Sequence, residues 1–98
     1  MSKVVIHTDH APAAIGPYSQ AIKVNGMLFV SGQIPINPAS GEIEGKDIVA
    51  QSTQVFENLK AIIAQAGSDM GSIVKTTVYL QDIKDFAAMN KVYATYFT

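Results

Sequence analysis

Three short clusters in this sequence carry groups that could bind or transform a small polar molecule. Tyr18 follows a Gly-Pro turn, and its phenol could hydrogen-bond to a substrate or share a proton with it. Ser31 and Gly32 end an apolar run, where a glycine lets a ligand approach the backbone closely. Asn90 lies within an apolar, helix-like pattern, where a buried amide needs hydrogen-bond partners. These four residues are the candidates for a binding or catalytic site.

Each candidate also has a purely structural explanation. Tyr18 could be a half-buried tyrosine at a strand end, and Asn90 could cap a backbone group as readily as contact a ligand. Ser31 has no visible base partner, so a nucleophilic serine is not expected. His7 and His10 lie three residues apart, but no helix is predicted there and no carboxylates converge on them. We therefore expect no metal site.

Composition excludes several classes of protein. There is no cysteine, which rules out disulfides, thiolate catalysis and cysteine-based zinc sites. No G-x-S-x-G elbow, P-loop, H-E-x-x-H or dinucleotide fingerprint occurs. The net charge is −1, and the scattered basic residues are all lysines, so a nucleic-acid interface is not expected. No signal peptide or membrane-length apolar run is visible, and we expect a soluble, cytoplasmic protein.

The chain's length and composition are typical of one globular domain. It has 98 residues, of which 48% are hydrophobic and 15% charged. A chain this short is only marginally stable alone. Its high apolar content therefore favours burial of some surface against another subunit.

The first half of the chain predicts three short strands. Asn25 and Gly26 separate two apolar runs, and this pair is the strongest short signal of a hairpin because both turn residues must adopt positive φ. Prolines and glycines predict loops on either side. The predicted strands are residues 4–7, 18–24 and 27–31, and the predicted loops are residues 11–17 and 32–46.

The second half predicts a helix, a strand and a second helix. Apolar residues recur at steps of three and four between Asp47, a good N-cap, and Gly67, a C-terminal stop. Residues 73–80 are rich in β-branched types and apolar on both alternating faces, which is typical of a strand in the middle of a sheet. Asp85 is a possible N-cap for the second helix, whose apolar residues are Phe86, Met89, Tyr93, Tyr96 and Phe97.

The predicted order is β, β–β, α, β, α within one domain, residues 1–98. The pattern of the second helix is still running at Thr98, and no strand follows. Because a strand–helix unit usually leads into a further strand, we expect a domain interrupted after its second helix.

The clusters together resemble the RidA/YjgF family in order and spacing, and the resemblance covers the whole chain. The matching stretches are residues 13–21 (AAIGPYSQA), 30–35 (VSGQIP), 41–42 (GE), 74–80 (VKTTVYL) and 85–90 (DFAAMN).

This resemblance implies a chorismate-mutase-like α+β fold, with two helices packed on one face of a sheet. It also implies a homotrimer with ligand sites in the clefts between subunits. Family members of this type hydrolyse 2-imino acids such as 2-iminobutanoate and 2-iminopropanoate, or their enamines, to 2-keto acids and ammonia without a cofactor. Tyr18, Ser31, Gly32 and Asn90 match family pocket positions. The resemblance makes Tyr18 and Asn90 the expected catalytic residues, and Ser31 and Gly32 the expected substrate-binding residues.

The sequence departs from the family pattern in one respect. The family anchors the substrate carboxylate on an arginine after the second helix and has a glutamate linked to water activation further on. Both positions lie beyond Thr98, and residues 1–98 contain no arginine. A lysine supplies charge but not the planar fork, so we expect these residues alone to be nearly inactive. A keto-acid-binding sensor and, less favoured by the charge, an RNA-cleaving translation inhibitor are the alternative functions.

Overall fold

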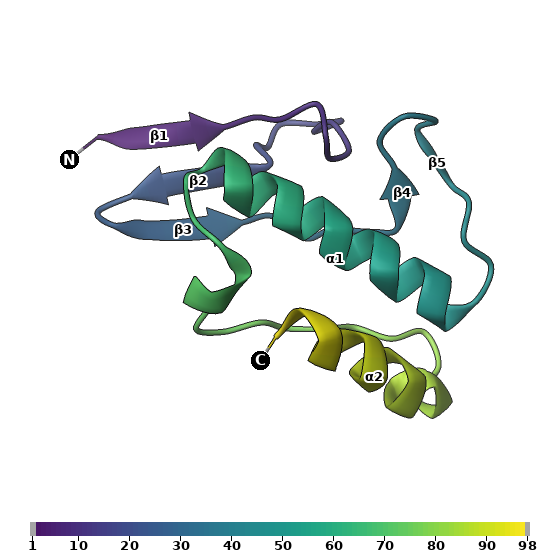
Figure 1. The fold of residues 1–98 in the computed structure, drawn as a ribbon. Coiled ribbons are helices and arrows are strands. Elements are labelled where there is room, and N and C mark those ends of the chain that lie inside the picture. Colours follow the sequence, from purple (N-terminus) through teal and green to yellow (C-terminus); the bar gives the residue numbers. More distant parts are fainter. Residues whose placement is uncertain (1, 98) are drawn as a thin grey trace.

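The computed structural model describes residues 2–97, which form two small antiparallel sheets and two α-helices (Figure 1). The predicted α+β class is confirmed. The strands are β1 (Lys3–Ile6), β2 (Ala21–Val24), β3 (Met27–Val30), β4 (Ile36–Asn37) and β5 (Glu42–Ile43), the helices are α1 (Ile48–Gln65) and α2 (Phe86–Tyr96), and the 3₁₀ turns are η1 (Met70–Ser72) and η2 (Ile83–Asp85).

The main sheet has the strand order β1-β2-β3, and all its pairings are antiparallel. The predicted hairpin joins β2 to β3, with Val24 opposite Met27. Asn25 and Gly26 have φ angles of 53° and 77°, as a two-residue turn with positive φ at both positions requires. The Asn-Gly signal therefore also fixes the register of the hairpin.

The two faces of this sheet have different surroundings. Ile6, Ala21 and Val30 stand opposite one another across the strands and face α1. Ile6 and Ala21 form the buried core with Ala11, Ile62 and Ala66, and Leu28, Val30 and Ala61 pack against them. Since side chains alternate along a strand, the other face carries Val5, Ile22, Val24, Met27 and Phe29. Of these, Val5, Met27 and Phe29 are more than half exposed.

Helix α1 begins and ends at the predicted signals. The Asp47 carboxylate accepts a hydrogen bond from the Ala50 N–H at 2.7 Å, as an N-cap does. At the other end, the N–H groups of Gly67 and Ser68 donate to the carbonyls of Ala64 and Ile63, and Gly67 has a φ of 82°. This is the Schellman arrangement, in which the left-handed conformation favours glycine.

Helix α2 lies against α1, and aromatic rings form the contact. Phe56 of α1 is buried, and its ring centroid lies 5.6 Å from that of Tyr93, 5.2 Å from that of Tyr96 and 5.7 Å from that of Phe97. Asp85 occupies the N-cap position of α2 but makes no side-chain capping bond. The capping bond lies earlier instead, where Asp82 accepts from the Lys84 N–H at 2.9 Å and caps η2.

The prediction of a strand at residues 73–80 is wrong, because within residues 2–97 this segment forms no ladder with any strand. It runs past α1 on the side of α2, away from β1–β3 (Figure 1). Val74 and Tyr79 are 95% and 92% exposed. A β-prone segment becomes a strand only when a neighbour pairs with its backbone, and α2 offers side-chain contacts instead, such as the 2.9 Å bond between Thr76 Oγ1 and Tyr93 Oη.

Two smaller predictions also need correction. The predicted loop at residues 32–46 contains the short β4–β5 ladder. The strand predicted from Tyr18 begins only at Ala21, because residues 16–18 form a tight turn in which the Tyr18 N–H bonds to the Gly16 carbonyl at 2.8 Å. Among residues 2–97, neither helix combines the length and apolarity that crossing a membrane requires.

Candidate functional site

Tyr18 lies in the loop between β1 and β2, with its side chain about half exposed. Its ring covers Gly16 so closely that a Cβ added to that glycine would lie 3.6 Å from the ring atoms Cδ2 and Cε2. Tyr18 is thus half-buried, as the structural explanation expects, but it lies in the loop before β2 and not in the strand itself. Its phenol is on the surface, where a small molecule can reach it.

Ser31 directly follows β3, and its side chain is already engaged. The Ser31 hydroxyl donates to the Ser19 carbonyl at 2.5 Å, and the Ser31 N–H donates to the Gln20 carbonyl at 3.0 Å. These two bonds tie the end of β3 to the residues that follow Tyr18. The Ser31 hydroxyl proton is thus engaged with a backbone carbonyl.

Gly32 lies beside Ser31 and is open to solvent. A Cβ built on Gly32 would meet no atom within 4 Å. The Gln33 side-chain amide folds back and donates to the carbonyls of Ser31 and Gly32 at 3.2 and 3.4 Å. The backbone at Gly32 thus has the free space that a closely approaching ligand needs.

Asn90 lies on α2 with its side chain exposed, next to the buried Met89. No hydrogen bond of its amide to another described residue is found, so the backbone-capping alternative has no support in residues 2–97. The loop that carries Tyr18 and helix α2 lie on opposite sides of α1 (Figure 1). A single chain therefore brings Tyr18, Ser31 and Gly32 to one region but leaves Asn90 on another.

Sequence reasoning gave no role to two buried amides near this region. Gln20 is 2% exposed, and its side chain bonds to the backbone of residues 8–12. Asn58 of α1 is 1% exposed and donates to the carbonyls of Ile36 and Ile34 at 2.9 and 3.3 Å. The sequence could have pointed to both residues, because each is a neutral amide beside apolar core positions, and a buried amide must find hydrogen-bond partners.

Two open grooves lie along α1, and neither contains the four candidates. One, of about 440 Å³, is lined by Lys60, Ala64, Ser68, Asp69, Met70, Gly71, Thr95 and Tyr96. The other, of about 410 Å³, is lined by Thr8, His10, Glu57, Lys60, Ala61, Ala64 and Gln65. Tyr18 and Gly32 are therefore separate from both of these grooves.

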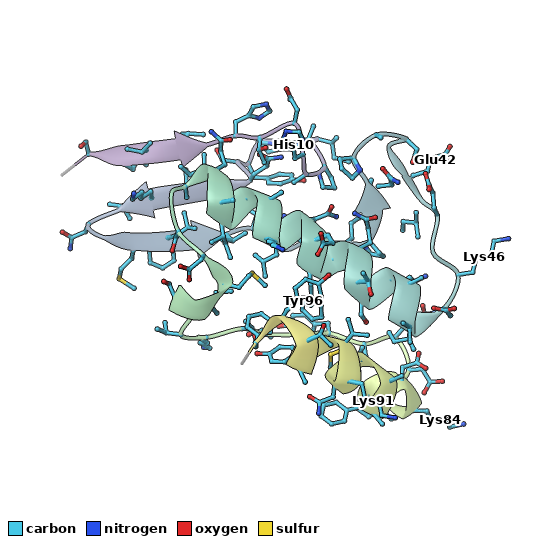
Figure 2. All side chains as sticks on the ribbon, in the orientation of Figure 1. His10, Glu42, Lys46, Lys84, Lys91 and Tyr96 are labelled. Atoms are coloured by element: carbon cyan, nitrogen blue, oxygen red, sulfur yellow. The ribbon has the colours of Figure 1, made fainter. Side chains whose placement is uncertain are left out.

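The phenol of Tyr96 is a weaker acid than that of an unperturbed tyrosine. Burial is the main cause, and a 2.5 Å hydrogen bond to the Glu57 carboxylate and the charge of that group add to it, so that the pKa of Tyr96 rises to about 12. Figure 2 shows Tyr96 on α2, facing α1. The Tyr96–Glu57 bond thus joins the two helices as long as the phenol is protonated.

We predict a specific loss of stability at high pH. The pKa of Tyr96 is about 12 in the folded protein, compared with 10.0 for an unperturbed tyrosine, which is the value expected in the unfolded chain. Its contribution is therefore complete below pH 10 and is lost as the pH rises towards 12. Urea unfolding should show a steeper decline over this range than in Tyr96→Phe, and absorbance titration should lose its highest-pKa tyrosine in that variant. Equal declines in both proteins would contradict the prediction.

Comparisons with known proteins place this geometry in a family. The family model described as Endoribonuclease L-PSP matches residues 8–98. A RutC family protein of Pyrococcus abyssi is 57% identical over 97 residues, which are 99% of this chain and 76% of that protein. The 2-iminobutanoate/2-iminopropanoate deaminase of Escherichia coli is 49% identical over 98 residues, which are 100% of this chain and 75% of that protein.

Solved structures agree in fold. A crystal structure of a protein of the conserved Rid family from Yersinia pestis has a TM-score of 0.95 at 49% identity, covering 97% of this chain and 75% of that one. Escherichia coli TdcF with bound serine has a TM-score of 0.90 at 46% identity, covering 94% of this chain and 72% of that one. The chain therefore belongs to the endoribonuclease L-PSP family, which includes the RutC and Rid proteins, and its resemblance to RidA/YjgF is confirmed.

Proposed function

We propose that the protein hydrolyses reactive 2-imino acids and their enamines, such as 2-iminobutanoate and 2-iminopropanoate, to 2-keto acids and ammonia in the cytoplasm. The observation that carries this proposal is the 49% identity, over the whole chain, to a relative named for that activity. The candidate residues are of the right chemical types. Tyr18 and Asn90 offer neutral polar groups, and Ser31 and Gly32 offer a backbone that a small substrate can approach.

The reaction depends more on how the site positions the substrate and a water molecule than on a strong acid or base. Water must add to the carbon of the C=N bond, its protons must pass to the nitrogen, and the nitrogen must leave as ammonia. A site has to hold the substrate beside an oriented water and a polar group near the nitrogen. The exposed phenol of Tyr18 and the open space over Gly32 suit one wall of such a site, and the exposed amide of Asn90 suits the other.

We infer that a site with both walls needs a second copy of the chain, since the loop that carries Tyr18 and the helix α2 that carries Asn90 lie on opposite sides of α1 (Figure 1). The uncovered sheet face offers a surface for that assembly. Val5, Met27 and Phe29 on it are 57%, 55% and 57% exposed, and contiguous apolar surface of this kind marks a protein interface. We propose a homotrimer with clefts between its subunits.

Sedimentation tests the assembly. The protein should sediment as a trimer, and Phe29→Asp should shift it towards the monomer because a charge would be buried without a partner. Val49→Asp is the matched control, because Val49 is similarly exposed but lies on α1, away from the sheet face. A protein that remains trimeric with Phe29→Asp would show that the sheet face is not part of the interface.

Steady turnover tests the activity. A 2-imino acid is generated in situ by a dehydratase or an amino acid oxidase, and release of the 2-keto acid is followed with and without the protein. We expect the protein isolated from its own cells to accelerate release, and residues 1–98 alone to add little, because they hold no guanidinium fork for the substrate carboxylate. No acceleration by the isolated protein would overturn the proposal.

Binding without turnover is the second candidate function. The structure of TdcF, 46% identical, is described with bound serine, so a related chain can hold a small carboxylate-bearing molecule. Saturable binding of 2-ketobutyrate without imine turnover would support this sensor. RNA cleavage, to which the family description refers, suits a net charge of −1 poorly, and steep salt-dependent RNA binding would be needed to support it.

A further inference from the structure

We propose that Gln20 is a positioning residue of the site, because its buried carboxamide closes the loop that carries Tyr18. The inference rests on the proposed function for the role of Tyr18 alone. The closure itself is a property of the chain and can be measured whether or not the protein hydrolyses imines.

One side chain joins the two ends of this loop. The Gln20 Nε2 donates to the Pro12 carbonyl at 2.8 Å and to the Thr8 carbonyl at 3.0 Å, and the Gln20 Oε1 accepts from the Thr8 N–H at 2.7 Å. The Gln20 side chain therefore holds together the two ends of the loop formed by residues 13–19. With Gln20 2% exposed, water cannot replace these bonds freely.

The base of the clamp is rigid. Ala11 is 3% exposed and belongs to the core with Ile6, Ala21 and Ile62, and Ala21 directly follows Gln20. Both ends of the clamp are thus anchored in packed side chains. Movement of residues 8–12 against β2 would have to break the bonds of Gln20 and open this core.

The rest of the loop has little else to hold it. Ile15 is 86% exposed and Tyr18 51% exposed, so burial does not fix their positions. The bonds found for the part carrying Tyr18 are the turn from the Tyr18 N–H to the Gly16 carbonyl and the bond from the Ser31 hydroxyl to the Ser19 carbonyl. The place of the Tyr18 ring therefore depends on Gln20 at the ends of the loop and on Ser31 beside it.

Only glutamine among similar side chains satisfies this geometry. The clamp needs two donated bonds and one accepted bond from one planar group, which a carboxamide provides. Glutamate would keep the acceptor but lose the donors and bury a charge. Methionine has similar length but no strong donor or acceptor, so Gln20→Met removes the clamp while filling the space.

NMR relaxation tests the proposal. In the wild type, the backbone order parameter at Tyr18 should be about 0.85, and in Gln20→Met it should fall below about 0.6, with loss of the ring contact between Tyr18 and Gly16. Ile63→Ala is the control, because Ile63 is buried on α1 outside the core that holds the clamp. It should lower global stability and leave Tyr18 ordered.

Each outcome decides the matter. An ordered Tyr18 in Gln20→Met, or equal disorder in Ile63→Ala, overturns the proposal. Should Gln20→Met fail to fold, amide hydrogen exchange in the wild type decides instead: the Thr8 N–H, which donates to the Gln20 Oε1, should be protected, and fast exchange at Thr8 overturns the proposal. In the imine assay, Gln20→Met should lower kcat/KM at least about tenfold while Ile63→Ala does not. A disordered Tyr18 together with no wild-type turnover would reject the deaminase and leave the clamp standing.

Discussion

Replacing Phe56 with alanine should lower the free energy of unfolding by about 3–5 kcal/mol, the usual cost of removing a buried phenylalanine. Phe56 is 5% exposed and contacts the rings of Tyr93, Tyr96 and Phe97. Its loss leaves a cavity where α2 meets α1. Since small domains have only about 5–15 kcal/mol of stability, this change should detach α2 or unfold the chain.

Urea unfolding followed by circular dichroism measures the effect. Val49→Ala is the matched control on the same helix, because Val49 is 50% exposed and an exposed change should stay within about 0.5 kcal/mol. Tyr93→Phe should fall between them, since it keeps the ring and loses only the 2.9 Å bond to Thr76. A loss for Phe56→Ala no larger than that for Val49→Ala would show that α2 is held by other contacts.

Local signals in the sequence predicted the parts of the fold that depend on neighbours along the chain. Asn25-Gly26 fixed a turn because its geometry admits few other residues, and Asp47 and Gly67 bounded α1 because helix ends must satisfy their own backbone groups. Each signal acts within a few residues. No distant contact is needed to read it.

The largest failures concern contacts between distant residues. Residues 73–80 have the side chains of a strand, but whether they pair depends on what lies beside them, which no local pattern states. Tyr18 was singled out as a candidate, whereas Gln20, whose side chain bonds to the start of the same loop, was not, because Thr8 and Pro12 lie 12 and 8 residues away. The sequence therefore offered candidate groups but not the contacts that position them.

The four candidate residues were picked out by their types and local setting, none of them belongs to a generic catalytic motif, and the resemblance assigned their expected roles. One chain places three of them together and Asn90 elsewhere. This separation is informative, because it turns the proposed assembly into a statement about which copy supplies which group. A site built from two copies behaves differently from a site within one chain when variants are mixed.

Tyr18→Phe and Asn90→Ala should each lower kcat/KM for imine hydrolysis by about 10²-fold, the usual scale for losing one polar group that holds or protonates a reacting substrate. The effect should appear in the protein isolated as a trimer, with stability nearly unchanged, because both side chains are exposed. Tyr79→Phe is the control for the tyrosine change, since Tyr79 is 92% exposed and lies outside the candidate site. An equal loss of kcat/KM in Tyr79→Phe would show that the effect of Tyr18→Phe is not specific, and would contradict a catalytic role for Tyr18.

Mixing the two variants gives the stronger test. If one copy supplies Tyr18 and its neighbour supplies Asn90, a trimer that contains both variants holds some clefts with both native side chains. Random exchange of equal amounts should restore about a quarter of the wild-type activity, because each cleft draws its two walls independently from different subunits. If a single chain supplied both residues, every cleft would lack one of them and mixing would restore nothing. Recovery therefore supports a shared site, and its absence, with exchange verified by mass spectrometry, rejects it.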